Sequence, residues 1–283
     1  MKPEQISVQM YTLRSISATD FEAALKAVAD IGLKNVELAG LQGLSADELR
    51  ALLDKYGLKA RSAHVPYQAF EEDADAAIAD YAKLGCEWVI VPAPPLDRLL
   101  AGGEFGWADL ANLSAHQLST LSGDELAAKY TLGKEKIEEF CKNLSDWAAK
   151  VNAAGMKFGY HNHHFEYLFR TADGQSMYEY MLANSPIIFQ ADAFWAEVGG
   201  KNAAEVIAAN PDRVALVHIK DGSERMPGKD VPFGEGIMDW DAIIAAADAA
   251  GVEYYVIELD NPNPADPAAD VRTAFENAMA KTN

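Results

Sequence analysis

The amino-acid sequence predicts a (β/α)8 barrel of the TIM type, folded as a single domain. The prediction rests on eight apolar runs of strand length, on amphipathic helical patterns between them, and on a glycine that recurs where a helix gives way to a strand. A length of 283 residues suits such a barrel, which commonly reaches this size as one domain. A doubly wound open sheet also alternates strands and helices, and it is the rival architecture.

The eight predicted strands are short runs enriched in β-branched, aromatic and other apolar residues. Four are predicted in the first half of the chain, near residues 6–13, 35–39, 59–65 and 87–93. Four more are predicted in the second half, near residues 157–162, 187–192, 213–220 and 254–260. Eight strands that alternate with helices have the count and order of a closed barrel.

Helices are predicted between these strands because apolar residues recur there at helical spacing. Thr19 with Glu22, and Ser45 with Glu48, have the spacing of capping boxes, so the first two helices are expected to begin there. A last helix is predicted near residues 267–281. Five helices are predicted to end in the left-handed conformation that glycine adopts readily, at Gly32, Gly57, Gly85, Gly155 and Gly251.

Two connections are too long to be plain turns. The connection after the fourth strand is an insertion at about residues 95–132, whose apolar residues include Phe105 and Trp107 and indicate a folded lid or a subunit contact in a homo-oligomer. The connection after the seventh strand, near residues 221–240, is rich in glycine, proline and charged residues. Both leave the sheet where strands end, so both are placed to cover a pocket there.

The composition argues against several classes of protein. Lys and Arg number 24 against 43 Asp and Glu, and the formal charge of −19 disfavours nucleic acid, whose phosphates require basic partners. The N-terminal residues lack the apolar core of a secretory signal, and no apolar run reaches the ~18 residues of a membrane span. We therefore expect a cytoplasmic protein without a membrane contact. Cys86 and Cys141 are expected to be buried free thiols.

Residues suited to chemistry gather at the carboxyl ends of the predicted strands, where barrels of this type keep their active sites. Five of the six histidines are among them, and only His116 lies elsewhere. No glycine-rich nucleotide-binding motif and no nucleophile-elbow motif occurs. The strand-end set comprises Tyr11, Glu37, His64, the group from His161 to Glu166, Asp192, His218, Lys220, Glu258 and Asp260.

The alternation of side chains along the strands favours a metal site within this set. His218 and Lys220 share one face of their strand, and Asp192 and Glu258 each end the same kind of face on theirs. If these faces line the barrel, Asp192, His218 and Glu258 converge with a further ligand from the fifth strand. Carboxylate and imidazole ligands without thiolates suit Mn²⁺, Co²⁺, Zn²⁺ or Mg²⁺.

A plainer interpretation stands beside each of these assignments. A histidine at a strand end often only hydrogen-bonds the backbone, which is the alternative for His64. An aspartate after a strand is often a helix cap, which is the alternative for Asp192 and Asp221. Glu37 suits a structural carboxylate bridge as well as a functional role. Trp195 follows Asp192 closely, and this sets it apart from the other tryptophans as a platform for a sugar.

Several segments, in their order along the chain, resemble the xylose-isomerase-like (β/α)8 superfamily, and in particular its sugar phosphate isomerase/epimerase branch. They are VQMYTLR, KNVELAGLQGLSADELRALLDKYGLKARSAHV, FGYHNHHFEY, FQADAFWAEVGGKN, VHIKDG, FGEGIMDW and YYVIELD, and the match runs through nearly the full chain outside the insertion.

The resemblance implies one divalent metal ion, manganese foremost, held at the ends of the fifth to eighth strands by Glu, Asp, His and Glu. Asp192, His218 and Glu258 match the last three of these positions. The epimerases carry a glutamate at the first position, where this chain does not. We expect His161 as the ligand there, with Glu166 or His163 as the alternatives.

The resemblance also implies isomerisation or epimerisation of a small sugar or sugar derivative, by proton abstraction next to a carbonyl through an enediolate. Glu258 would be the base, an imidazole such as His163 or else Glu166 the partner acid, and Lys220 the donor to an oxyanion or hydroxyl. The alternative is a lyase or hydratase acting on 3-keto-glycosides or inosose-like rings, and a second alternative is a sugar-binding barrel without turnover. The residues expected to bind the sugar are Tyr11, His64 and Trp195.

Overall fold

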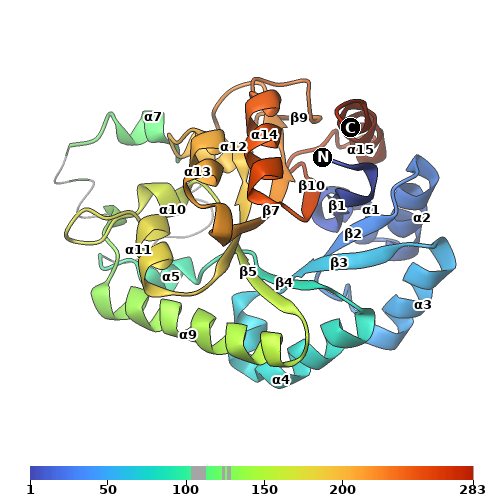
Figure 1. Ribbon diagram of the computed structural model, residues 1–283, viewed down its shortest axis with the longest axis horizontal. Helices are drawn as coiled ribbons and strands as arrows, with labels where there is room; N and C mark the ends of the chain where they lie inside the picture. The colour runs from blue at the N-terminus through green and yellow to red at the C-terminus, as the bar shows by residue number, and fades with distance from the viewer. Residues whose placement is uncertain (103–112, 123–124, 126–128, 283) are drawn as a thin grey trace.

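The computed structural model describes residues 1–102, 113–122, 125 and 129–282. Eight parallel strands form a closed barrel in the order β1, β10, β7, β6, β5, β4, β3, β2, with helices around it (Figure 1). Because β1 pairs with both β2 and β10, the predicted (β/α)8 barrel is confirmed and the open-sheet alternative is wrong. The barrel strands are β1 (Ile6–Gln9), β2 (Asn35–Ala39), β3 (Lys59–His64), β4 (Trp88–Val91), β5 (Lys157–His161), β6 (Ile188–Asp192), β7 (Val214–Ile219) and β10 (Tyr254–Ile257).

Helices cover the outside of the barrel (Figure 1). Their buried apolar residues belong to the same core cluster as those of the strands. The longer ones are α2 (Phe21–Ile31), α3 (Ala46–Tyr56), α4 (Tyr67–Leu84), α9 (Lys134–Ala153), α11 (Met177–Asn184), α13 (Ala203–Ala209), α14 (Trp240–Ala250) and α15 (Pro267–Ala280). Shorter turns are η1 (Pro3–Gln5), η2 (Met10–Leu13), α1 (Arg14–Ser17), α5 (Leu96–Leu99), α7 (Ala115–Leu118), α10 (Phe165–Leu168), α12 (Ala193–Val198) and η3 (Pro211–Arg213).

The predicted helix-closing glycines are confirmed. All five have a positive φ, from 64° at Gly57 to 110° at Gly32, a region in which a side chain with a Cβ is strained. At Gly57 the backbone N–H donates to the carbonyl of Leu53, and the chain enters β3 two residues later. A left-handed glycine at the end of each of these helices thus allows the next strand to begin within a few residues.

One of the two predicted capping boxes is confirmed and the other is wrong. Ser45 and Glu48 exchange the expected hydrogen bonds at the start of α3. At α2 the cap is Asp20, whose Oδ1 accepts the N–H of Ala23 at 2.9 Å. Thr19 instead donates to the carbonyl of Ile16, because the preceding turn runs on to that position.

The first strand is shorter than the predicted 6–13. It ends at Gln9, where the side-chain Oε1 accepts the backbone N–H of Tyr11 at 3.0 Å and the chain turns into η2. This turn carries Tyr11 off the barrel wall and out to the rim, where 45% of the residue is exposed.

The inside of the barrel has an apolar layer and, toward the carboxyl ends of the strands, a polar one. Trp88, Ile90 and Leu216 form a buried apolar cluster. The polar layer is almost closed to solvent, so its groups must find partners within the protein. Its buried members include Gln9, Glu37, Ser62, Gln190 and His218, and the partly buried His64 lies beside them.

The connection after β7 folds around one buried carboxylate. It contains a small antiparallel pair, β8 (Asp221–Gly222) and β9 (Asp230–Val231). The carboxylate of Asp221 accepts the backbone N–H groups of Gly234 and Gly236 and the indole N–H of Trp240 at 2.7 Å. Asp221 therefore organises this loop and does not cap a helix, which was the simplest expectation for it.

The insertion after β4 is described only in part. Its ends are joined by a bridge between Leu100 and Leu132, and α5 and α7 lie within it. Phe105 and Trp107, on which the expectation of a lid or subunit contact rested, lie outside the described residues. Cys86 and Cys141 are buried free thiols, as predicted. Within the described ranges, no helix has both the length and the apolar character to cross a membrane.

Candidate functional site

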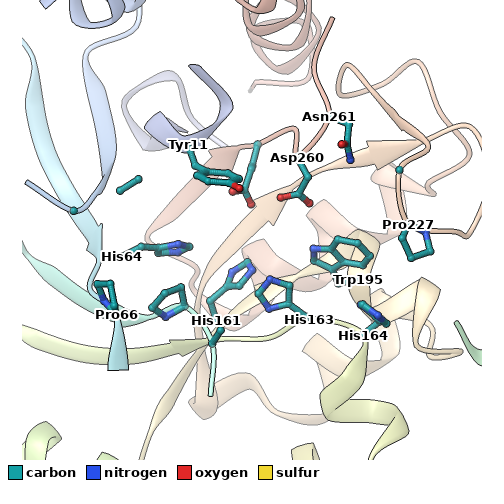
Figure 2. A pocket seen from close by; sticks show the side chains of 16 residues that line it. Tyr11, His64, Pro66, His161, His163, His164, Trp195, Pro227, Asp260 and Asn261 are labelled. Atoms are coloured by element: carbon teal, nitrogen blue, oxygen red, sulfur yellow. The ribbon is translucent and has the colours of Figure 1, made fainter. Parts of the chain in front are cut away.

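A cavity of about 640 Å³ opens at the carboxyl ends of the barrel strands. Figure 2 shows aromatic and imidazole rings arranged around it, with the carboxylate of Asp260 facing the same space. Among its lining residues are six that the sequence pointed to as ligands or sugar contacts. These are Tyr11, His64, His161, His163, Trp195 and Glu258, and Asp260 and Asn261 lie beside them.

Four side chains from four strands meet just below this cavity, and two of them, His161 and Glu258, line it. His161 ends β5, Asp192 ends β6, His218 lies in β7 and Glu258 follows β10. All four are buried, and one ligand atom from each lies within 4.8 Å of the others. Ligands around a tetrahedral cation at ~2.1 Å are about 3.4 Å apart, so only a small inward movement would let them share one ion.

His218 is the centre of this group. Its Nδ1 lies 2.7 Å from Glu258 Oε2 and 3.9 Å from Asp192 Oδ2, and its Nε2 lies 2.8 Å from Glu37 Oε1. Burial opposes a charge on the ring, but Glu258 and Glu37 raise the pKa of His218 to about 10. A cation that takes Nδ1 must therefore displace a proton from this ring.

Lys220 lies beside these carboxylates. Its Nζ is 3.1 Å from Glu258 Oε2, 3.2 Å from Asp192 Oδ2 and 2.5 Å from Asp260 Oδ2. Although burial acts in the opposite direction, these carboxylates raise the pKa of Lys220 well above its usual value. Lys220 and His218 thus supply the positive charge against which the three acids are held.

The carboxyls differ in their surroundings. Burial acts to raise the pKa of Glu258, but Lys220 and His218 outweigh it and lower that pKa. Burial raises the pKa of Asp192 despite the same two cations, and it raises the pKa of Asp260 to about 7. Glu258 is consequently the carboxylate that stays ionised most readily at the cavity.

His161 and His163 are held as neutral rings. Burial, assisted by neighbouring His218, lowers the pKa of His161, and burial with Lys220 lowers that of His163. The neutral imidazole is the form that binds a metal ion. The ring centroids of His161 and His218 are 4.5 Å apart, and those of His161 and His163 are 4.8 Å apart.

Asp192 combines the two roles that the sequence left open. Its Oδ1 accepts the N–H of Trp195 at 2.8 Å and so caps α12, while Oδ2 is turned to Lys220. Asn162 fixes the neighbouring backbone, because its amide exchanges hydrogen bonds with the N–H and C=O of Asp192 at 3.2 and 3.3 Å. The cap and this clamp fix the direction of the carboxylate.

Glu166 does not reach the cavity. Its Oε1 accepts the hydroxyl of Tyr160 at 2.5 Å and its Oε2 accepts the N–H of His163 at 2.7 Å. Burial raises the pKa of Glu166 to about 8. This arrangement gives Glu166 a structural position behind β5, where it holds the turn that carries His163, and does not favour the ligand or acid role considered for it.

The expected sugar contacts line the cavity. Trp195 is buried, and its ring lies 5.1 Å from the ammonium of Lys220. Among the described residues its indole nitrogen has no hydrogen-bond partner, and Figure 2 shows this nitrogen on the side of the ring that faces the cavity. Tyr11 stands at the rim with the guanidinium of Arg14 stacked 4.4 Å from its ring.

The sequence left the role of Glu37 undecided between a structural carboxylate and a functional one. The structure shows which groups its carboxylate contacts. The side chain is fully buried, and its two oxygens contact Gln9, Ser62, Gln190, His64 and His218. Burial acts to raise its pKa, but His64 and His218 hold that pKa well below the usual value. The sequence did contain a sign of this network: Glu37 lies between Val36 and Leu38 on a buried strand, and a buried carboxylate must have polar partners.

The fold and the floor of the cavity define a (β/α)8 barrel with a candidate metal centre of two imidazoles and two carboxylates. The sequence profile described as "xylose isomerase-like TIM barrel" matches residues 25–280, and the chain belongs to this family. No curated protein matches the chain.

Solved structures share the fold. A sugar phosphate isomerase/epimerase from Parabacteroides distasonis is 23% identical, with a TM-score of 0.73 and 97% of each chain covered. A structure of L-ribulose 3-epimerase is 16% identical, with a TM-score of 0.66, over 99% of this chain and 94% of that one. A probable 3-DHS dehydratase from Bacillus anthracis is 12% identical, with a TM-score of 0.66, over the full length of both chains.

Proposed function

We propose that the chain is a divalent-metal-dependent isomerase or epimerase of a small sugar. The observation that carries the proposal is the convergence of four buried side chains, His161, Asp192, His218 and Glu258, on one point below an open cavity. Manganese is our first choice of ion, and Co²⁺, Zn²⁺ and Mg²⁺ share the preference for such ligands.

The donor set fits a divalent cation. None of the described residues donates a hydrogen bond of normal geometry to the buried Oδ2 of Asp192, although this atom lies 3.2 Å from the Lys220 ammonium. The two imidazoles provide nitrogen ligands, and Asp192 and Glu258 provide two negative charges. A cation bound there would polarise a carbonyl of the sugar and stabilise negative charge on its oxygen.

The remaining chemistry belongs to side chains of the chain itself. Glu258, which is ionised and lines the cavity, removes the proton from the carbon next to the carbonyl. Lys220 donates a hydrogen bond to the neighbouring sugar oxygen. His163, which lines the cavity next to His161, exchanges the proton on the other side of the sugar.

The walls of the cavity suit an uncharged sugar. Among the described residues that line it there is no lysine or arginine, and the charge of Lys220, which lies beneath the lining, is already balanced by three carboxylates, whereas phosphate sites are commonly built from free basic side chains. His64, Trp195 and Tyr11 offer ring faces and hydrogen-bonding groups to hydroxyls of the substrate. An uncharged keto-sugar is therefore the substrate class that we favour over a sugar phosphate.

A lyase or hydratase acting on 3-keto-glycosides or inosose-like rings is the second candidate. It is favoured by the imidazole of His161 at the fifth strand, where the proposed epimerisation would otherwise use a second carboxylate. Carboxylate and imidazole together suit a reaction in which one group removes a proton and a different group protonates a leaving oxygen.

The test is incubation of the Mn²⁺-loaded protein with a panel of uncharged ketoses and 3-keto-glycosides in D₂O. Exchange of the hydrogen next to the carbonyl, with a product of unchanged mass apart from the deuterium, supports the isomerase or epimerase. Loss or gain of water, or cleavage of the glycoside, identifies the lyase or hydratase instead. Saturable sugar binding without any exchange contradicts both enzymes and identifies a sugar-binding barrel.

A further inference from the structure

We infer that Glu37, on β2 and outside the candidate metal centre, is a positioning residue that sets the tautomers of both histidine ligands. The inference rests on a hydrogen-bond chain whose direction can be followed atom by atom. It deepens the proposed metal site, but its first measurement requires no metal.

The series of hydrogen bonds begins at Gln9, whose side-chain amide is oriented by a backbone N–H group. Its Oε1 accepts the N–H of Tyr11 at 3.0 Å, so its Nε2 is the group that donates to Glu37 Oε1 at 2.8 Å. An amide N–H cannot accept a hydrogen bond. Glu37 Oε1 is therefore an acceptor at this point.

The same oxygen determines the state of His218. Nε2 of His218 lies 2.8 Å from Glu37 Oε1, so this nitrogen carries a proton and donates it. The other nitrogen, Nδ1, faces Glu258 at 2.7 Å and Asp192 at 3.9 Å. Because Nδ1 also faces a carboxylate, it too carries a proton in the metal-free protein; a cation would displace this proton while Glu37 holds the one on Nε2, as in other carboxylate–histidine–metal arrangements.

The second oxygen of Glu37 acts on His161 through Gln190. Nε2 of Gln190 donates to Glu37 Oε2 at 2.6 Å, which turns Gln190 Oε1 toward His64 Nε2 at 2.7 Å and His161 Nδ1 at 3.1 Å. An amide oxygen only accepts, so His161 carries its proton on Nδ1. Its Nε2 keeps the lone pair that a cation requires.

Replacement of Glu37 by glutamine has a specific expected consequence. The new amide keeps its oxygen toward Gln9, because Nε2 of Gln9 can only donate there. Its NH₂ group then faces Gln190, whose amide must turn over to present an oxygen. The NH₂ group of Gln190 now faces His161 Nδ1, and the proton of His161 moves to Nε2, where it blocks coordination.

The exchange of the two side chains restores the pattern. In the double variant Glu37→Gln/Gln190→Glu, a carboxylate at position 190 accepts from the amide at 37 and from His161 Nδ1. The number of charges and the side-chain volumes are unchanged. Ser62→Ala is the matched control, because it removes a neutral donor to Glu37 Oε2, at 2.6 Å, without reversing any hydrogen bond.

The test is long-range ¹H–¹⁵N correlation NMR of metal-free protein labelled with ¹⁵N-histidine, with the His161 signals assigned by loss in His161→Gln. We expect a proton on Nδ1 in the wild type, the Ser62→Ala control and the double variant, and on Nε2 in Glu37→Gln. A proton on Nε2 in the wild type, or an Nδ1 proton retained in Glu37→Gln, overturns the inference.

Metal affinity is the second measurement, with Co²⁺ as the probe in competition with a chelator. Loss of such a supporting contact weakens metal binding about 10- to 100-fold, so we expect that loss in Glu37→Gln and its recovery in the double variant. Equal Co²⁺ affinity in Glu37→Gln and the wild type contradicts the positioning role. Wild-type protein that fails to bind Co²⁺ refutes the proposed metal site, while the NMR result still decides the tautomers.

Discussion

Asp192 Oδ1 accepts the backbone N–H of Trp195 at 2.8 Å, and this single contact joins the candidate metal centre to the wall of the cavity. The carboxylate caps α12 with one oxygen and presents the other to Lys220 at 3.2 Å. The helix that begins at this cap carries Trp195 into the cavity. A ligand and a sugar contact are therefore positioned by the same turn of the chain.

This double role predicts different outcomes for two substitutions of Asp192. Asn is also a good cap, so Asp192→Asn should leave the free energy of unfolding of the metal-free protein nearly unchanged but weaken Mn²⁺ binding strongly. Asp192→Ala should lose the cap as well, at about 1 kcal/mol. Urea unfolding with chelator present and Mn²⁺ titration measure the two effects. Wild-type Mn²⁺ affinity in Asp192→Asn would show that this carboxylate is not a ligand.

Lys220→Met should destabilise the metal-free protein by about 3–5 kcal/mol, because it leaves two buried carboxylates, Asp192 and Glu258, and the partly buried Asp260 without their ammonium partner. Mn²⁺ should restore more stability to this variant than it adds to the wild type, since the cation replaces the missing charge. Lys157→Met is the control: its partner Glu253 is at the surface, so a change of at most about 1 kcal/mol is expected. Urea unfolding of each variant, with chelator and with Mn²⁺, measures these changes in the free energy of unfolding. A Lys220→Met variant as stable as the wild type in chelator would contradict this account.

The buried Glu166 predicts a pH-dependent stability. Burial raises its pKa from the ordinary 4.5 to about 8, so the folded protein keeps a proton that the unfolded chain releases. Its contribution is fully present below pH 4.5 and is lost as the pH rises to about 8. Glu166→Gln should flatten this slope and exceed the wild type in stability above pH 8.

Chemical unfolding at intervals between pH 5 and 9 measures this slope. Glu48→Gln is the control, because this exposed glutamate has a lowered pKa and glutamine also suits its capping box, so no change is expected in that range. If the free energy of unfolding of Glu166→Gln and of the wild type changed with pH in parallel, the folded protein would not hold a proton on Glu166 in this range.

We predict that the indole N–H of Trp195 contributes to sugar binding but not to metal binding. Trp195→Phe keeps an aromatic ring and removes the donor, so we expect KM to rise about 2- to 10-fold for a ketose that exchanges deuterium. Mn²⁺ affinity should not change. Trp88→Phe is the control, because its indole N–H donates to Glu253 at 3.0 Å in the apolar layer below the site. Equal effects of the two variants on KM would argue against a contact between Trp195 and the sugar.

The barrel was predictable because its signals are local. Strand runs, helix stripes and glycines such as Gly57 are each visible within a few residues. The shortened first strand was not predictable, since it depends on one side-chain contact from Gln9 to the N–H of Tyr11. The wrong cap at Thr19 has a similar cause, because the preceding turn displaces the start of α2 to Asp20.

The site was predictable where residue type and strand end agree, as for His218 and Glu258. Glu166 shows the limit of this reasoning. It lies only five residues after His161, but its carboxylate is held behind the strand by Tyr160. The partnership of Glu37 with His218 and Gln190 joins residues distant in the sequence, and barrel closure alone brings them together.

The most direct test of the central claim is the metal content of protein purified without chelator and equilibrated with Mn²⁺, determined by elemental analysis. The claim predicts about one divalent ion per chain in the wild type, and a strong loss in both Asp192→Ala and His218→Ala, with both variants folded. Wild-type protein that retains no ion from Mn²⁺, Co²⁺, Zn²⁺ or Mg²⁺ would contradict it, as would full metal content in both variants.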